Sequence, residues 1–273
     1  MGHVTKILGA ALGAMLVVSA HAAQTSDAKQ IVQQAVNAEL AANRDDHSHW
    51  RYIETEMDGS KYVVVETQYG AIKRHIDYQW HPAPAWVLSA DDAYNQKFIN
   101  DPSMQAKQKR DGQHDDKSAT ELLNMLPEAF DWKIESENAE TTTLSFQPDP
   151  DFDPPNMEGR VMGKMQGTLV VDKKQHRIQT MKGRLSEDIN IGFGILGRLK
   201  QGGTFNVERR QVAPGLWQIT QTHVHIDGRA LFFKTIGQQQ DEVKSEFTQV
   251  PAGTTLQQAM EMLAAPASKT SGK

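Results

Sequence analysis

Three glycines in one short segment have a spacing that is typical of a binding loop. The segment IGFGILGRLKQGG, residues 191–203, contains Gly192-x-Gly194-x-x-Gly197, the spacing with which dinucleotide-binding folds hold a phosphate. Such a site needs an apolar strand before the glycines, a helix after them, and an acidic residue about 20 positions later. Here the preceding residues are half polar, LKQGG leaves little room for a helix, and the distal position lies near Trp217. The sequence therefore predicts no nucleotide and no other cofactor.

Three alternate aspartates have the opening spacing of a calcium loop. Asp149, Asp151 and Asp153 could turn their carboxylates towards one ion. The sixth position of the loop is Pro154 where glycine is required, and the twelfth is Arg160 where glutamate is required. The sequence therefore excludes an EF-hand and favours a solvated loop, with a looser cation site as the alternative.

Two histidine pairs could begin a zinc site. His223-x-His225 and His47-x-His49 each place two imidazoles on one side of an expected strand, because side chains at i and i+2 share a face. Neither pair has an obvious third ligand, so the sequence predicts no metal, and His223 and His225 are the candidates if one binds. The chain contains neither G-x-S-x-G nor H-E-x-x-H. We therefore expect a non-catalytic protein, with a hydrolase or metal-dependent enzyme as the alternative.

The N-terminus predicts export. Lys6 precedes a mostly apolar stretch over residues 7–18, and Ala20-His21-Ala22 has the small residues of a cleavage site. The stretch is shorter than the roughly 20 residues of a spanning helix. We therefore expect a signal peptide over residues 1–22, cleavage near Ala22, a periplasmic or secreted product, and no spanning segment in the mature chain.

The composition limits both the architecture and the partners. The chain has 273 residues, of which 38% are hydrophobic and 23% charged, so it can bury a sizeable core. It has no cysteine, so the core must stabilise it without disulfides. The formal net charge of -5 makes nucleic acid an unsuitable partner, because such binding depends on neutralising phosphates.

Periodicity predicts an α+β fold. Apolar residues at helical spacing predict a helix over residues 27–43, and a capped helix carrying Leu256, Met260 and Leu263 follows Pro251. Runs rich in β-branched and aromatic residues predict antiparallel strands. These runs are 49–57, 60–68, 71–80, 132–137, 141–147, 162–172, 176–185, 203–212, 216–226 and 229–237. We expect them to form one large curved antiparallel sheet, with helices against its concave face, in a single domain over residues 23–266 and a flexible tail over residues 267–273.

A helical insert interrupts the strands near residues 82–129. A helix opens near Ser89, and Ser118-x-x-Glu121 is a capping box that predicts another helix start. Between them, the mixed charges of residues 107–117 predict a solvated face or loop. The insert is therefore expected to contain two or three helices.

One hairpin resembles a known family. The segment GTLVVDKKQHRIQTMKGRL, residues 167–185, is similar to a hairpin of outer-membrane lipoprotein-sorting carriers, the LolA/LolB-like proteins. The resemblance rests on Gly167, Val171, Asp172, Arg177 and Ile178. It implies an unclosed antiparallel barrel whose helices plug the concave side, and a cavity that shelters acyl chains from water. The long helical insert and the acidic, proline-rich loop near residues 148–155 depart from the family pattern.

We accordingly expect a carrier that binds a lipid, a lipoprotein acyl chain or another apolar ligand. Methionines suit a cavity wall that accommodates variable chains, and an exposed apolar loop suits its lip. An envelope-assembly protein that binds partner proteins through a sheet edge is a further alternative. The ligand-binding candidates are Ile191, Phe193, Ile195, Leu196, Trp217, Phe232, Phe233, Met165 and Met181.

Overall fold

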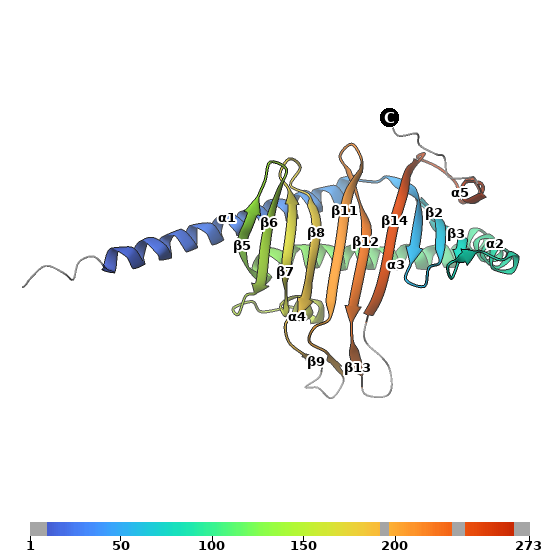
Figure 1. The fold of residues 1–273 in the computed structure, drawn as a ribbon. Coiled ribbons are helices and arrows are strands. Elements are labelled where there is room, and N and C mark those ends of the chain that lie inside the picture. The colour runs from blue at the N-terminus through green and yellow to red at the C-terminus, as the bar shows by residue number, and fades with distance from the viewer. Residues whose placement is uncertain (1–9, 192–196, 231–237, 265–273) are drawn as a thin grey trace, which may run out of the picture.

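The chain folds around one 11-stranded antiparallel sheet (Figure 1). The computed structural model describes residues 10–191, 197–230 and 238–264. In spatial order the strands are β4-β3-β2-β1-β14-β12-β11-β8-β7-β6-β5, and β4 and β5 form the two edges, so the sheet is not closed into a barrel. The α+β class and the large antiparallel sheet expected from the periodicity are confirmed.

The strands follow the alternating runs of the sequence closely. Those of the large sheet are β1 (His49–Glu56), β2 (Lys61–Thr67), β3 (Gly70–Tyr78), β4 (His81–Pro82), β5 (Phe130–Glu137), β6 (Thr141–Pro148), β7 (Met165–Asp172), β8 (Ile178–Leu185), β11 (Thr204–Ala213), β12 (Leu216–Ile226) and β14 (Gln238–Val250). A small sheet at one end contains β9 (Ile189–Ile191), β10 (Gly197–Leu199) and β13 (Gly228–Ala230).

Strand β14 joins the two halves of the large sheet. It pairs with β1 on one side and with β12 on the other. Its sequence, QQQDEVKSEFTQV, has few apolar residues and did not predict a strand. The expected strand over residues 229–237 lies mostly outside the described residues, where β13 covers only its first two positions.

The structure describes five helices, which are α1 (Ala10–Asp45), α2 (Ala85–Asn100), α3 (Pro102–Ala129), α4 (Met157–Met162) and α5 (Leu256–Ala264). Helix α1 begins well before the expected residue 27. Among the described residues, no helix is long and apolar enough to cross a membrane. Cleavage near Ala22 stays a prediction.

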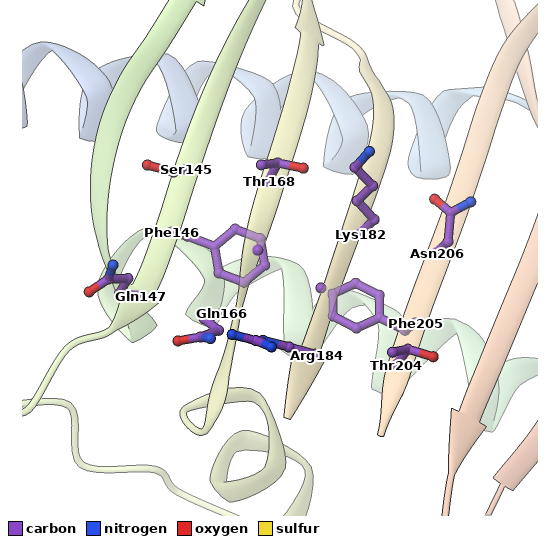
Figure 2. A pocket seen from close by; sticks show the side chains of 12 residues that line it. Ser145, Phe146, Gln147, Gln166, Thr168, Lys182, Arg184, Thr204, Phe205 and Asn206 are labelled. Carbon is purple, nitrogen blue, oxygen red and sulfur yellow. The ribbon is translucent and has the colours of Figure 1, made fainter. Parts of the chain in front are cut away.

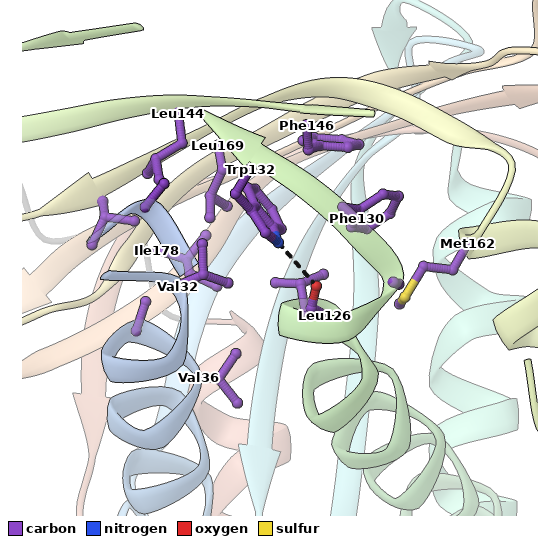
Figure 3. Packing of buried hydrophobic residues seen from close by; sticks show 14 residues of the cluster. Val32, Val36, Leu126, Phe130, Trp132, Leu144, Phe146, Met162, Leu169 and Ile178 are labelled. Atoms are coloured by element: carbon purple, nitrogen blue, oxygen red, sulfur yellow. Dashed lines mark hydrogen bonds between the residues drawn. The ribbon is translucent and has the colours of Figure 1, made fainter. Parts of the chain in front are cut away.

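Helices α1 and α3 cross the same face of the sheet (Figure 1). Val32 and Val36 of α1 and Leu126 of α3 pack there against the aromatic residues and leucines of β5, β6 and β7 (Figure 3). Trp132 is fully buried in this cluster, and its Nε1 donates to the carbonyl oxygen of Leu126 over 3.3 Å. We call this side of the sheet the α1 face and the other side the opposite face.

A second core lies on the opposite face of β1, β2 and β3. Ile53 lies on this face because successive side chains of a strand point to opposite faces of the sheet. It packs with Val63 and Val65 beneath helix α5. Leu256, Ala259 and Leu263 are the buried residues of α5. The helix starts with the expected capping box, since the amide of Thr255 donates to Gln258 Oε1 over 2.9 Å and the amide of Gln258 donates to Thr255 Oγ1 over 3.2 Å.

The insert contains two long helices, α2 and α3. The expected start at Ser118 is wrong, because α3 already begins after Asp101, whose side chain accepts from the amides of Ser103 and Met104. Asp101 caps the helix and Pro102 occupies its first turn, which is a strong start signal. Residues 107–117 are all exposed on α3, which confirms the solvated face.

Candidate functional site

A buried ion cluster fixes α1 to the sheet. The side chain of Glu39 is completely buried, and its two oxygens accept from Arg177 Nε and Nη2 over 3.0 Å each. The amide of Ile178 donates to the same carboxylate over 2.8 Å, and Arg209 of β11 forms an ion pair with it. These contacts hold the C-terminal half of α1 at β8 and β11.

Beyond this cluster, the α1 face contains a half-exposed strip. Strand register places Met181, Val207 and Thr222 in one row across β8, β11 and β12. Phe205 and Val224 form the next row on the same face. All five side chains are only partly buried, whereas Leu169, next to Met181 on β7, is completely buried. We call these five residues the central strip, which is an accessible part of this face.

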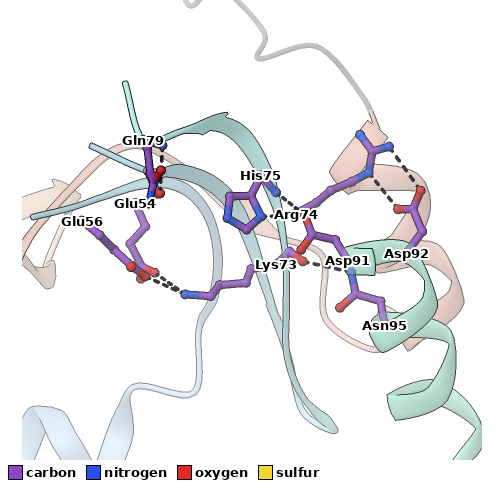
Figure 4. A network of polar contacts seen from close by, with 10 residues as sticks. Glu54, Glu56, Lys73, Arg74, His75, Gln79, Asp91, Asp92 and Asn95 are labelled. Atoms are coloured by element: carbon purple, nitrogen blue, oxygen red, sulfur yellow. Dashed lines mark hydrogen bonds and ion pairs between the residues drawn. The ribbon is translucent and has the colours of Figure 1, made fainter. Parts of the chain in front are cut away.

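The central strip ends at a charged cluster. Register continues the row from Thr222 to Glu242 of β14 and then to Glu56 of β1. Lys73 Nζ lies 3.1 Å from Glu54 Oε1 and 2.9 Å from Glu56 Oε1 (Figure 4). Lys244 Nζ lies 2.8 Å from Glu242 Oε1. An apolar surface and a zwitterionic surface therefore adjoin on one face of the sheet.

Burial shifts the pKa values of this cluster. Burial raises the pKa of Tyr52 far above its ordinary range, and the nearby Glu66 and Glu54 charges raise it further. Burial also raises the pKa of Glu66, although Glu66 accepts from the Trp50 amide over 3.1 Å. Burial would lower the pKa of Lys73, but Glu56 and Glu54 outweigh it and raise the pKa. Lys73 therefore stays charged and Tyr52 stays neutral across the physiological range.

The structure brings only some of the predicted ligand-binding residues together. Met165 and Met181 are partly buried against the same apolar core. Trp217 is buried elsewhere, where its Nε1 donates to Gln175 Oε1 over 3.2 Å. Ile191 ends β9, opposite Gly197 of β10. Phe193, Ile195, Leu196, Phe232 and Phe233 lie outside the described residues.

The opposite face has its own hollow, of about 600 Å³ (Figure 2). Thr168, Lys182 and Asn206 form one row along it, and Gln166 and Arg184 lie in the next row. Between the rows lie Phe146, Gly167, Gly183 and Phe205, whose register places them on the α1 face, so they contribute backbone to the floor. Polar side chains surround this hollow, but most of its exposed lining is apolar.

The candidate zinc histidines share one carboxylate. His225 Nε2 lies 2.6 Å from Asp241 Oδ2, and His223 Nδ1 contacts Asp241 Oδ1. The hydrogen bond from His223 lowers the pKa of Asp241. Asp241 lies on β14, the strand that the sequence did not predict, so sequence reasoning missed it.

No metal centre is apparent in the parts of the chain that the structure describes. There, no three His, Cys, Asp or Glu side chains are placed to hold a metal ion. This includes Asp149, Asp151 and Asp153, and Asp149 Oδ1 instead accepts from the amide of Asp151 over 2.8 Å. Within the described residues, the looser cation site is therefore not supported.

The glycine-rich segment lies between two strands. β9 and β10 are antiparallel partners, and Gly197 is the first residue of β10. A strand therefore follows the third glycine where a dinucleotide site needs a helix. This context agrees with the prediction that the segment binds no nucleotide.

The residues of the resemblance have structural roles in the β7–β8 hairpin. Gly167 pairs with Gly183, and a Cβ on Gly167 would lie 2.0 Å from the carbonyl oxygen of Lys182. Asp172 Oδ1 accepts from the amide of Gln175 in the turn over 2.7 Å. Arg177 binds Glu39 of α1, so this hairpin positions the helix on the sheet.

No known protein family, curated protein or solved structure matches the chain.

Proposed function

We propose that the chain binds an amphiphilic ligand, such as a lipid or a lipoprotein acyl chain, without catalysis. The central strip carries the proposal. Its apolar side chains are half exposed on the face that α1 and α3 cross, next to a fully packed core. An apolar surface that helices cover only in part is a common form of ligand site.

The two ends of the strip suit the two ends of an amphiphile. Met181, Val207 and Val224 offer aliphatic and thioether contacts to a hydrocarbon chain. Six buried methylenes would contribute about 5 kcal/mol, at roughly 0.8 kcal/mol each. At the other end, Lys73 and Lys244 can donate to a polar headgroup, and the neighbouring glutamates can accept from one.

The proposed ligand site is consistent with the export that the N-terminal sequence predicts. A chain that shelters hydrocarbon is useful where lipids must cross an aqueous compartment. We therefore expect this protein to act in the periplasm or outside the cell, after cleavage near Ala22, with the amphiphile and envelope proteins as its partners.

The test combines native mass spectrometry with a substitution that fills the strip. The exported protein is expected to carry an extractable amphiphile and to bind N-phenyl-1-naphthylamine in competition with palmitate. Val207→Trp should greatly weaken both, because the indole would occupy the apolar surface. Val170→Trp is the matched control, since Val170 is also half buried but lies on the opposite face of β7.

The outcomes separate the candidate functions. Equal probe binding by Val207→Trp and the parent protein, with both folded, would place the ligand elsewhere. A parent protein that carries no amphiphile and binds no probe would contradict the proposal and favour the envelope-assembly alternative. Hydrolysis of an extracted lipid by the parent protein would favour an enzyme.

A further inference from the structure

Two tryptophans are exposed to an unusual degree. Trp80 is 73% exposed and Trp86 is 65% exposed, whereas Trp50, Trp132 and Trp217 are buried. Tryptophan is highly buried on average in folded proteins. Two such exposed indoles on one part of a chain indicate a surface that contacts something apolar.

Both indoles lie at the β3–β4 hairpin. Trp80 lies in the tight turn between β3 and β4 and covers Gly59 of the β1–β2 turn. Trp86 lies in the first turn of α2 and contacts Tyr78 of β3, with 5.6 Å between the ring centroids. Met57, next to the β1–β2 turn, is also exposed, at 53%. We call Met57, Tyr78, Trp80 and Trp86 the aromatic rim.

Backbone conformation keeps Trp80 in the turn. Gln79 and Trp80 have φ angles of 49° and 68°, which are uncommon for residues other than glycine. Each such residue costs about 1 kcal/mol or more. A Cβ on Gly59 would lie 2.1 Å from Trp80 Cδ2, so only glycine leaves room for the ring. A costly turn that holds a large apolar ring in solvent indicates a function for the ring.

A row of ring contacts connects the rim with the charged end of the central strip. Lys73 Nζ lies 4.0 Å from the ring centroid of Tyr62, and the Tyr62 and His75 ring centroids are 4.1 Å apart. His75 in turn contacts Tyr78 with 5.6 Å between centroids, and Tyr78 contacts Trp86. The rim is therefore continuous with the proposed ligand site.

Four of the charged residues beside the rim form ion pairs within the protein. Lys61 Nζ lies 3.4 Å from Asp77 Oδ2, and Arg74 Nε lies 2.8 Å from Asp92 Oδ1 (Figure 4). Among the described residues, Asp58 next to Met57 forms no ion pair, so the charges beside the rim give it no strong attraction to an anionic surface. Contact with a bilayer would then depend on the rings, whose amphipathic character suits the lipid headgroup region.

We propose that the aromatic rim docks on the surface of a phospholipid bilayer, with Trp80 and Trp86 in the headgroup region. The inference rests on the proposed function, because it identifies the bilayer as the source or destination of the amphiphile. It further requires that docking be independent of anionic lipid and insensitive to salt.

The test measures docking on phosphatidylcholine vesicles whose acyl chains carry bromine, which quenches nearby tryptophans. The full chain should cosediment with the vesicles and lose fluorescence. Trp80→Asn/Trp86→Gln should lower the partition coefficient about tenfold or more, because each indole buries a large apolar area. Asparagine is chosen at position 80 because it tolerates positive φ. Raising the salt from about 0.05 to about 0.5 M should change docking by the parent protein less than about twofold, since salt screens only charge interactions.

The controls separate docking from folding and from ligand binding. Ile219→Thr/Val243→Thr removes exposed apolar side chains from β12 and β14 and should dock like the parent protein. Trp86→Gln alone changes no residue of the β3–β4 turn and should still weaken docking. The double tryptophan variant should keep its binding of N-phenyl-1-naphthylamine, and Val207→Trp should keep its docking.

Unchanged docking by both tryptophan variants, or docking that needs anionic lipid and disappears in salt, would overturn the inference. A parent protein that binds the probe but no vesicles would overturn the inference alone. A parent protein that binds vesicles through the rim but no probe would instead contradict the proposed ligand site.

Discussion

The substitution Glu39→Gln tests how α1 is held on the sheet. Glu39 is completely buried and binds Arg177 through two hydrogen bonds and Arg209 through an ion pair. Removing one partner of a buried ion pair costs about 3–5 kcal/mol, because the remaining charge stays in a poorly solvated place. Glutamine can still accept from the Ile178 amide. We therefore expect a loss of about 3 kcal/mol in the free energy of unfolding, a large part of the usual 5–15 kcal/mol.

The pH dependence of this loss has a definite sign. Burial alone would raise the pKa of Glu39, but the Arg177 hydrogen bond and the charges of Arg209 and Arg177 outweigh it and lower the pKa. A carboxyl whose pKa is lower in the folded chain stabilises the fold above its unfolded pKa. The ordinary value is 4.5, so the stabilisation should be complete above that pH and decline as the pH falls through the folded pKa. The difference between the parent protein and Glu39→Gln should shrink accordingly in acid.

Urea unfolding followed by far-UV circular dichroism measures this loss. The matched control is Glu128→Gln, because Glu128 is 66% exposed and pairs only at the surface with Lys29, 2.5 Å away. Exposed pairs contribute about 0–1 kcal/mol, so this control should stay close to the parent protein. If Glu39→Gln also stays within about 0.5 kcal/mol of the parent protein, the ion cluster does not hold α1 on the sheet.

Two further predictions concern packing and burial. Gly167→Ala should lower the unfolding free energy by about 1–3 kcal/mol or more, because the added Cβ would lie 2.0 Å from the Lys182 carbonyl oxygen; thermal unfolding measures this. Gly112→Ala, with no heavy atom within 4 Å of its added Cβ, should instead stabilise α3 by about 0.5–1 kcal/mol, and equal effects of the two would contradict the close approach at Gly167. Glu66→Gln should raise the unfolding free energy at neutral pH, because burial raises the pKa of Glu66 and so penalises its charged form there. In urea titrations this gain should vanish below the ordinary glutamate pKa of 4.5, and a loss of stability at neutral pH would show that the charge is favourable.

Local sequence signals located most of the elements. Alternation found the strands that carry their own apolar residues, such as KYVVVET in β2, because one face of each is buried. The pair Thr255 and Gln258 located the start of α5, since both of its hydrogen bonds are local. The same rule was wrong at Ser118, where a helix capped earlier by Asp101 simply continues. A capping box permits a helix start but does not prevent a longer helix.

The candidate site was less predictable, because its members meet only across strand pairs. Met181 is the one predicted ligand residue that belongs to the central strip, and Val207 and Val224 join it through the register of β8, β11 and β12. Trp80 gave no signal in the sequence, because the same β-rich run could have placed its ring in the core. Asp241 was missed because β14 has too few apolar residues to predict a strand.

The amino-acid sequence predicts the α+β class, most strand positions, a helical insert near residues 82–129 and the absence of cysteine chemistry. These properties depend on periodicity, capping and composition, which act over a few residues. Three other features are visible only in the folded chain: β14 joins the two halves of the sheet, Glu39 contacts Arg177 and Arg209, and Trp80 stays in solvent. Such contacts depend on strand register and on burial between distant segments, and no local pattern in the chain specifies either.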